Sequence, residues 1–199
     1  LTENLGKRGR RITELGAREL SSARAFEKVG YIAAKIDKIT YNMDFDLGRR
    51  EGTVVVNVSL LERGQLPEAI PKMAKVFAAK LGVGRLAALF GPGERVGDVA
   101  VPEGKVGVGT VCSITFNGVL LTHGIPVTSR FGGLLELRAL KPTRFVELIH
   151  YEGTTLDPLE VFIRSGMTDY KGAVETGNGL VGASFREVPG NSRERVLGI

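Results

Sequence analysis

The residues best suited to chemistry lie in one run, residues 107–133, which combines many glycines and hydroxyl side chains with Cys112, the only cysteine. Glycine costs backbone entropy and a buried hydroxyl needs a hydrogen-bond partner, so this mixture is unusual in an ordinary core strand or helix. Backbone N–H groups, hydroxyls and the guanidinium of Arg130 are instead suited to binding a small anion. Hairpins and turns with polar caps use the same residue types, and this alternative stays open.

A second candidate segment, YEGTTLDPLEVFI over residues 151–163, places Gly153, Thr154 and Thr155 before a predicted helix. Exposed N–H groups at the start of a helix attract anions. The alternative is that Thr155 or Asp157 simply caps the helix. A shared anion site requires both segments to meet in one cleft. The ligand-binding residues that we predict are Cys112, Ser113, Thr115, Thr128, Ser129, Arg130, Thr154 and Thr155.

Cys112 and His123 suggest a different chemistry, that of a small hydrolase or transferase with a cysteine nucleophile. A reactive thiolate needs a base or an electropositive setting. His123 and His150 are the two histidines of the chain, and the sequence places neither of them beside Cys112. A buried structural cysteine is the interpretation that we favour, so we predict no catalytic residue and a protein that is not an enzyme.

No cofactor or metal site is predicted. Gly177, Gly179 and Gly182 form a nominal G-x-G-x-x-G pattern, but a dinucleotide fingerprint follows a strand and opens a helix. Here a predicted helix precedes the glycines and a predicted strand follows them. The histidines, the cysteine and the scattered carboxylates show no metal-ligand spacing.

Helices and strands are interleaved along the chain without strict alternation, which predicts an α+β fold with a mixed sheet and flanking helices, preceded by a long N-terminal helix. We expect a hairpin turn at Lys141-Pro142, and we expect Gly82 and Gly124 to end helices. The predicted helices cover residues 14–40 (as one helix or two in series), 66–82, 114–124, 157–166 and 168–177. The predicted strands cover 53–61, 86–90, 105–111, 125–131, 134–141, 144–153 and 179–189.

Composition indicates a globular protein with a real core: 43% of the 199 residues are hydrophobic and 25% are charged. No apolar run approaches the roughly 18 residues of a membrane span, so no membrane partner is expected. A single cysteine fits a reducing cytoplasm. Residues 1–50 hold 11 Lys/Arg against 7 Asp/Glu and so most of the net charge of +5. Such a basic cluster can bind phosphate backbones, but it is more often a solvated surface.

Three segments resemble the regulatory domain of the NrpR family, the nitrogen-responsive transcriptional repressors of archaea and some bacteria. They are GTVCSITFNGVLLTHGIPVTSRFGGLLEL, RFVELIHYEGTTLDPLEVFI and GNGLVGASFREVP. The likeness extends from about Gly52 to Pro189. The N-terminal RRITELGAREL is similar to the wing and final helix of a winged-helix DNA-binding domain. We therefore expect the remnant of such a domain over 1–24, a linker helix and loop over 25–50, and an NrpR-type regulatory domain over 51–199.

The resemblance implies an effector-binding and dimerisation domain of a cytoplasmic repressor of nitrogen-assimilation genes. It implies that 2-oxoglutarate is the allosteric effector, that the effector releases the repressor from operator DNA, and that the protein is a homodimer. The DNA would be bound through the N-terminal domain, of which this chain keeps only a small part. A dicarboxylate needs charge-assisted donors at both ends, and Arg130 is the donor that we expect for one of them.

Overall fold

The computed structural model describes residues 2–4, 9–14, 16–17 and 30–199. A short N-terminal hairpin pairs β1 (Thr2–Asn4) with β2 (Arg10–Ile12). The helix predicted over 14–40 lies partly outside the described residues. Within them, the helix α3 spans Tyr31–Tyr41 and carries two buried side chains, Ile32 and Ile36, on one face.

The first of two three-stranded sheets has β7 (Lys105–Val111) at its centre, with β3 (Val56–Glu62) and β4 (Ala87–Phe90) on either side. All three strands were predicted, and they pair antiparallel. Gly109 in the central strand faces the Phe90 ring, where a Cβ atom would lie only 2.8 Å from the ring carbon Cε2. This glycine therefore makes room for an aromatic side chain of the neighbouring strand.

The second sheet has the order β10 (Gly179–Glu187), β8 (Thr128–Arg138) and β9 (Lys141–His150), again antiparallel. The α+β class is confirmed. The expected mixed sheet is replaced by antiparallel pairing between all strands in the described parts of the chain.

The strand β8 corrects two predictions made for this region. It is one continuous strand where two were expected, because Gly132 and Gly133 keep the pairing with β9 and leave space for neighbouring side chains and backbone. A Cβ atom at Gly133 would lie 2.6 Å from the carbonyl oxygen of Glu147. The hairpin turn lies at Ala139 and Leu140, whose φ angles of 49° and 60° are left-handed, and not at Lys141-Pro142.

Short helices connect the strands, and their caps follow the sequence. Asp157 accepts hydrogen bonds from the N–H groups of Leu159 and Glu160, which confirms it as the N-cap of its helix. Gly124 has a left-handed φ of 70° immediately after another helix, as predicted. These helices are α5 (Ile114–Thr122), α6 (Pro158–Arg164), α7 (Tyr170–Thr176) and α8 (Arg193–Gly198).

The helix α4 (Leu66–Ala78) begins with Pro67 in its first turn as predicted, but it ends earlier than Gly82. The chain leaves it through Lys80, which has a φ of 57°. Gly82 instead lies against the Phe77 ring, where a Cβ atom would come within 3.2 Å. The remaining elements are β5 (Arg95–Val96), β6 (Val99–Ala100) and the 3₁₀ turns η2 (Arg63–Gln65), η3 (Tyr151–Gly153) and η4 (Gly190–Ser192).

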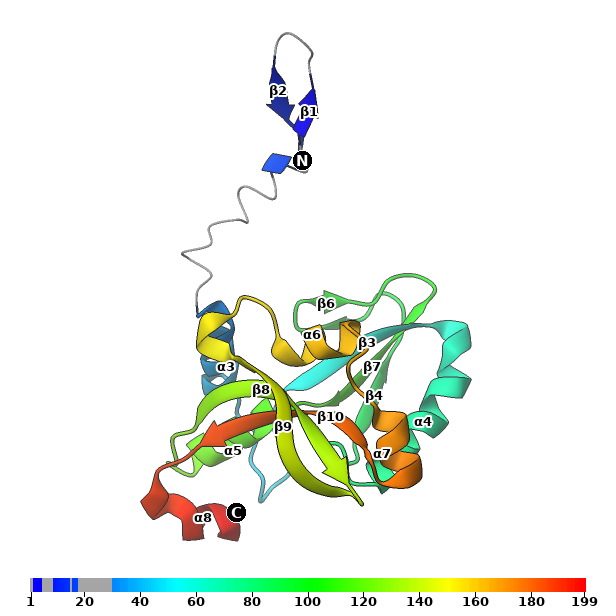
Figure 1. Cartoon of the computed structure of the whole chain (residues 1–199). Helices are drawn as coiled ribbons and strands as arrows, with labels where there is room; N and C mark the ends of the chain where they lie inside the picture. The colour runs from blue at the N-terminus through cyan, green and yellow to red at the C-terminus, as the bar shows by residue number, and fades with distance from the viewer. Residues whose placement is uncertain (1, 5–8, 15, 18–29) are drawn as a thin grey trace.

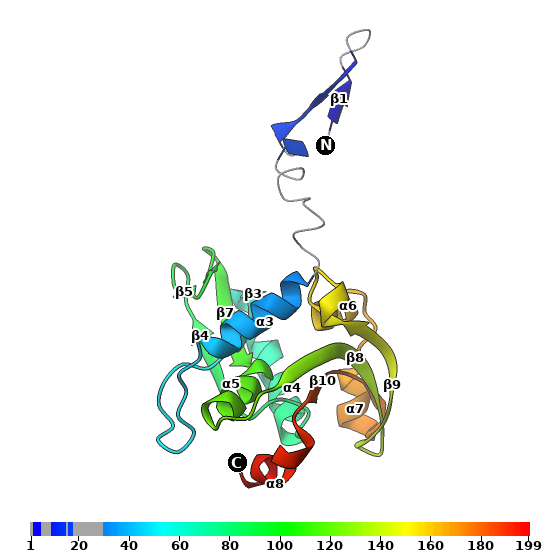
Figure 2. The same ribbon diagram turned by 90° about the vertical axis from the view of Figure 1, so that its left-hand side faces the viewer.

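The elements place α4 next to α7 on one side of the molecule, and α3 next to α5 on another (Figures 1 and 2). A core cluster between α3 and η3 contains Ile32, Ile36 and Tyr151, with Ala33 and Ile114 packed against it. Within the part of the chain that the structure describes, no helix combines the length and apolar character needed to cross a membrane.

Candidate functional site

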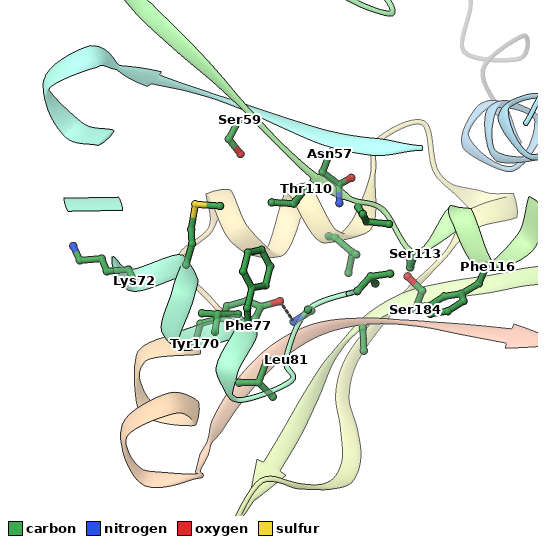
Figure 3. Close-up of a pocket in the computed structure, with 18 of the residues that line it drawn as sticks. Asn57, Ser59, Lys72, Phe77, Leu81, Thr110, Ser113, Phe116, Tyr170 and Ser184 are labelled. Carbon is green, nitrogen blue, oxygen red and sulfur yellow. Dashed lines mark hydrogen bonds between the residues drawn. The ribbon is translucent and has the colours of Figure 1, made fainter. Parts of the chain in front are cut away.

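A cavity of about 710 Å³ lies between the two sheets. Figure 3 shows Asn57, Ser59 and Thr110 on one wall, and Phe77 and Leu81 on the facing wall. The polar wall comes from β3 and β7, and the apolar wall comes mainly from α4, none of whose residues is buried. A volume of this size with an apolar lining and a few polar groups is typical of small-molecule sites.

Arg186 supplies the guanidinium at the edge of this cavity. The register of β10 against β8 shifts between Phe185 and Arg186, so the regular alternation of side chains is interrupted there. Arg186 Nε donates to Asn117 Oδ1 over 2.6 Å, and Nη2 donates to Ser113 Oγ over 2.8 Å. Asn117 is 2% exposed and donates in turn to Ser129 Oγ over 3.0 Å. The network joins α5 to both β8 and β10.

The charge of Arg186 has no counter-charge in the described structure. None of the carboxylates there forms an ion pair with it, and no acidic side chain is among the described residues that line the cavity. Burial lowers the pKa of the Arg186 guanidinium, although an arginine stays protonated in proteins. A partly buried cation without a carboxylate is costly, and a bound anion would compensate it.

Some of the predicted binding residues lie at this network and others have structural roles. Ser113 lines the cavity, and Ser129 contacts Asn117. Thr115 instead forms a reciprocal pair with the backbone of Val55, donating to its carbonyl oxygen over 3.1 Å and accepting from its N–H over 3.2 Å. That pair ties α5 to the residue preceding β3.

Arg130, our expected carboxylate donor, lies away from the cavity and is already paired. Its Nε lies 2.7 Å from Glu187 Oε2, and its Nη1 lies 3.6 Å from Glu152 Oε1. The hydrogen bond and charge of Glu187 raise the pKa of Arg130. Thr128 lies at the exposed start of the same strand. An anion at Arg130 would have to compete with two carboxylates of the protein itself.

The second predicted segment reaches the site through residues other than its threonines. Thr154 forms a local turn with Leu156, accepting from its N–H over 3.1 Å and donating to its carbonyl oxygen over 3.0 Å. Neither Thr154 nor Thr155 is among the residues lining the cavity. Leu159 lines it, and Tyr151 donates to the cavity residue Ser184 over 3.1 Å.

Cys112 and His123 lie at opposite ends of α5, which has 9 residues and is therefore about 13 Å long. His123 Nδ1 lies 2.8 Å from the carbonyl oxygen of Val119. Burial raises the pKa of the Cys112 thiol, which opposes thiolate formation. The described ranges also contain no group of three or more His, Cys, Asp or Glu side chains placed to hold a metal ion.

Arg186 and Asn117 are the important site residues that the sequence analysis did not single out. The available signal was charge: the segment 179–185 that precedes Arg186 has no charged residue, so a partly buried strand was to be expected there. A cation at the end of such a strand is a candidate site residue. Asn117 carried a weaker signal, as a lone amide in an apolar helix.

Comparison with known proteins identifies the family. A family model of NrpR regulatory domains NRD1 and 2 matches residues 29–199. The chain belongs to the NrpR family. This NrpR regulatory domain is 31% identical over 193 residues to the global nitrogen regulator NrpRI of Methanosarcina mazei, covering 97% of the chain and 59% of that protein.

Two further relatives support the assignment. The NrpR chain is 32% identical over 195 residues to the global nitrogen regulator NrpR of Methanococcus maripaludis, covering 98% of the chain but 33% of that protein. It therefore spans much less than the full length of these relatives. A crystal structure of a nitrogen repressor-like protein from Methanococcus jannaschii matches with a TM-score of 0.66 and 27% identity, over 84% of this chain and 67% of that one.

Proposed function

We propose that this NrpR regulatory domain is the effector-binding part of a transcriptional repressor of nitrogen-assimilation genes, and that 2-oxoglutarate is the effector. The observation that carries the proposal is the uncompensated guanidinium of Arg186 beside Ser113 at a cavity of about 710 Å³. The relatives are named as global nitrogen regulators, which supports the regulatory role. The resemblance described above supports 2-oxoglutarate as the ligand.

One carboxylate of the ligand would bind Arg186 and the hydroxyl of Ser113. The Nη1 of Arg186 forms no hydrogen bond with any described residue, so it is available as a donor without breaking the bonds to Asn117 and Ser113. Charge-assisted hydrogen bonds of this kind are about twice as strong as neutral ones. Lys72 is the other cation among the described residues that line the cavity, and it would provide the charge-assisted donor for the second carboxylate. Asn57, Thr110 and Ser184, which also line the cavity, offer neutral polar groups for the rest of the molecule.

We further propose that the repressor is a homodimer that binds operator DNA through its N-terminal domain and leaves the DNA when 2-oxoglutarate binds. Such release requires the effector to bind one arrangement of the dimer better than another. Typical coupling free energies between two sites are about 1–3 kcal/mol. A cavity between two sheets suits this role, because a ligand there contacts strands of both sheets together.

Thermal unfolding of the chain with added 2-oxoglutarate tests the proposal, with succinate as the control dicarboxylate. A ligand that binds only the native state stabilises it by mass action, by about 2.7 kcal/mol at a hundredfold excess over Kd. We expect the melting temperature to rise with 2-oxoglutarate concentration and to change less with succinate. An unchanged melting temperature at millimolar 2-oxoglutarate would reject the effector role.

A further inference from the structure

We infer that Tyr151 is a positioning residue that couples occupancy of the cavity to helix α3, through its hydroxyl on Ser184 and its ring on Ile32 and Ile36. The inference rests on the proposed function and adds a route by which the bound effector acts on the rest of the chain. It concerns α3 because this helix directly precedes the two three-stranded sheets in the chain.

The hydroxyl of Tyr151 is held at the cavity. It donates to Ser184 Oγ over 3.1 Å, and Ser184 lines the cavity. Tyr151 is only 5% exposed, and a Cβ atom at the neighbouring Gly132 would lie 3.2 Å from the Tyr151 oxygen. Burial and the bond to Ser184 therefore hold the hydroxyl in place, and a side chain at 132 would press on it.

The ring of Tyr151 is held at α3. Ile32 is 8% exposed and Ile36 is 6% exposed, and both form one buried cluster with Tyr151. Ile114 packs against the same cluster, and it directly follows Ser113, the hydroxyl that accepts from Arg186. Thus Ser184 is connected to the buried cluster at α3 through Tyr151, and Ser113 is connected to it through Ile114.

A carboxylate in the cavity changes this arrangement through the Ser184 hydroxyl. When Ser184 donates its proton to the ligand, its lone pairs stay turned towards Tyr151, and hydrogen bonds in such a chain strengthen one another. Burial also raises the pKa of the Tyr151 phenol, so its proton is present throughout the neutral range. The bound state therefore stabilises the packing of Tyr151 against α3.

Hydrogen exchange of residues 31–41, measured on this chain without ligand and with saturating 2-oxoglutarate, tests the inference. In the wild type we expect exchange in α3 to slow by about fivefold or more on binding, the lower end of typical allosteric couplings. In Tyr151→Phe the ring packing stays and the hydroxyl is lost. We expect this variant to bind 2-oxoglutarate, and its α3 exchange to slow no more than exchange in β9, which reports the general stabilisation of the fold by a bound ligand.

Tyr170→Phe is the matched control. Its hydroxyl also lies at the cavity, accepting from the N–H of Gly182 over 3.1 Å, but it belongs to α7. The response of α3 should persist in this variant. Ser184→Ala removes the partner of Tyr151 without changing the core around α3, so at saturation it should also lose the response.

Each outcome separates the two proposals. If the wild type binds 2-oxoglutarate and α3 responds equally in Tyr151→Phe and Ser184→Ala, the role of Tyr151 is wrong while the proposed effector site stands. If the wild type binds and its own α3 exchange does not change, the coupling is likewise wrong. Absence of binding by the wild type overturns the proposed function itself, and the coupling with it.

Discussion

Arg186 on β10 donates through Nη2 to the hydroxyl of Ser113, which precedes α5, over 2.8 Å. The two residues are 73 positions apart in sequence. Their contact lies at the cavity between the two sheets, and Asn117 holds the same guanidinium from one turn further along α5. An anion bound at this point would therefore contact β10 and the start of α5 together.

Replacing Arg186 by glutamine should abolish most of the affinity for 2-oxoglutarate. Hydrogen bonds to charged groups contribute about 1.5–3 kcal/mol, which corresponds to a roughly 10- to 150-fold rise in Kd. Calorimetric titration measures this change. Arg130→Gln is the matched control, because Arg130 is already paired with Glu187 and Glu152, and its Kd should stay within about twofold. If Arg130→Gln raised the Kd more than Arg186→Gln did, the anion would have to bind at Arg130.

The Cys112 thiol should react slowly in the native protein. Burial is the main cause of its raised pKa, and the thiolate is the reactive form. At pH 8 we expect alkylation to be slower than that of a free cysteine and to speed up on unfolding in denaturant. Fast alkylation of the native chain that is lost in His123→Ala would instead support a cysteine enzyme.

The stability of the fold should decrease at alkaline pH. Burial raises the pKa values of Cys112 and Tyr151, so the native state holds their protons more tightly than the unfolded chain does. Their contribution is complete below their ordinary pKa values of about 8.5 and 10, and it is lost as pH rises through the higher native values. Melting temperatures between pH 7 and 10.5 should show this decline, and Cys112→Ala should make it shallower. A steeper decline in that variant would contradict the assignment.

Asp157, and not Thr155, should stabilise α6. The Asp157 carboxylate accepts from the N–H of Leu159 over 2.8 Å, whereas Thr155 caps no described helix. Asp157→Ala should lower the free energy of unfolding by about 1 kcal/mol, the usual cost of losing an N-cap. Thr155→Ala should change it by less than about 0.5 kcal/mol. Denaturant unfolding of both variants measures the difference, and equal effects would show that the cap assignment is wrong.

The sequence was sufficient to predict those helices and strands that are marked by residues within the element itself. Asp157 and Pro158 marked the start of α6, and the β-branched run around Val56 marked β3. The hairpin turn was missed because two non-glycine residues, Ala139 and Leu140, adopt positive φ angles there. Nothing in their side chains favours that conformation, and the pairing of the two long strands β8 and β9 imposes it.

The candidate site was only partly predictable for a related reason. Arg130 and Arg186 both lie near strand ends, on β8 and β10, and their local sequences do not say which one is paired. Glu187, 57 positions away on β10, pairs with Arg130 over 2.7 Å, and Glu152 lies 3.6 Å from the same guanidinium. The register shift before Arg186 places that residue on Asn117 and Ser113 instead. Contacts between distant segments thus determine which of the two arginines is available to bind an anion.

A crystal structure of the chain with 2-oxoglutarate tests the central claim most directly. We expect one ligand in the cavity between the sheets, with a carboxylate within hydrogen-bond distance of Arg186 and Ser113. Arg130 should keep its contacts with Glu187 and Glu152 in that complex. A ligand bound at Arg130, or anywhere outside the cavity, would contradict the account.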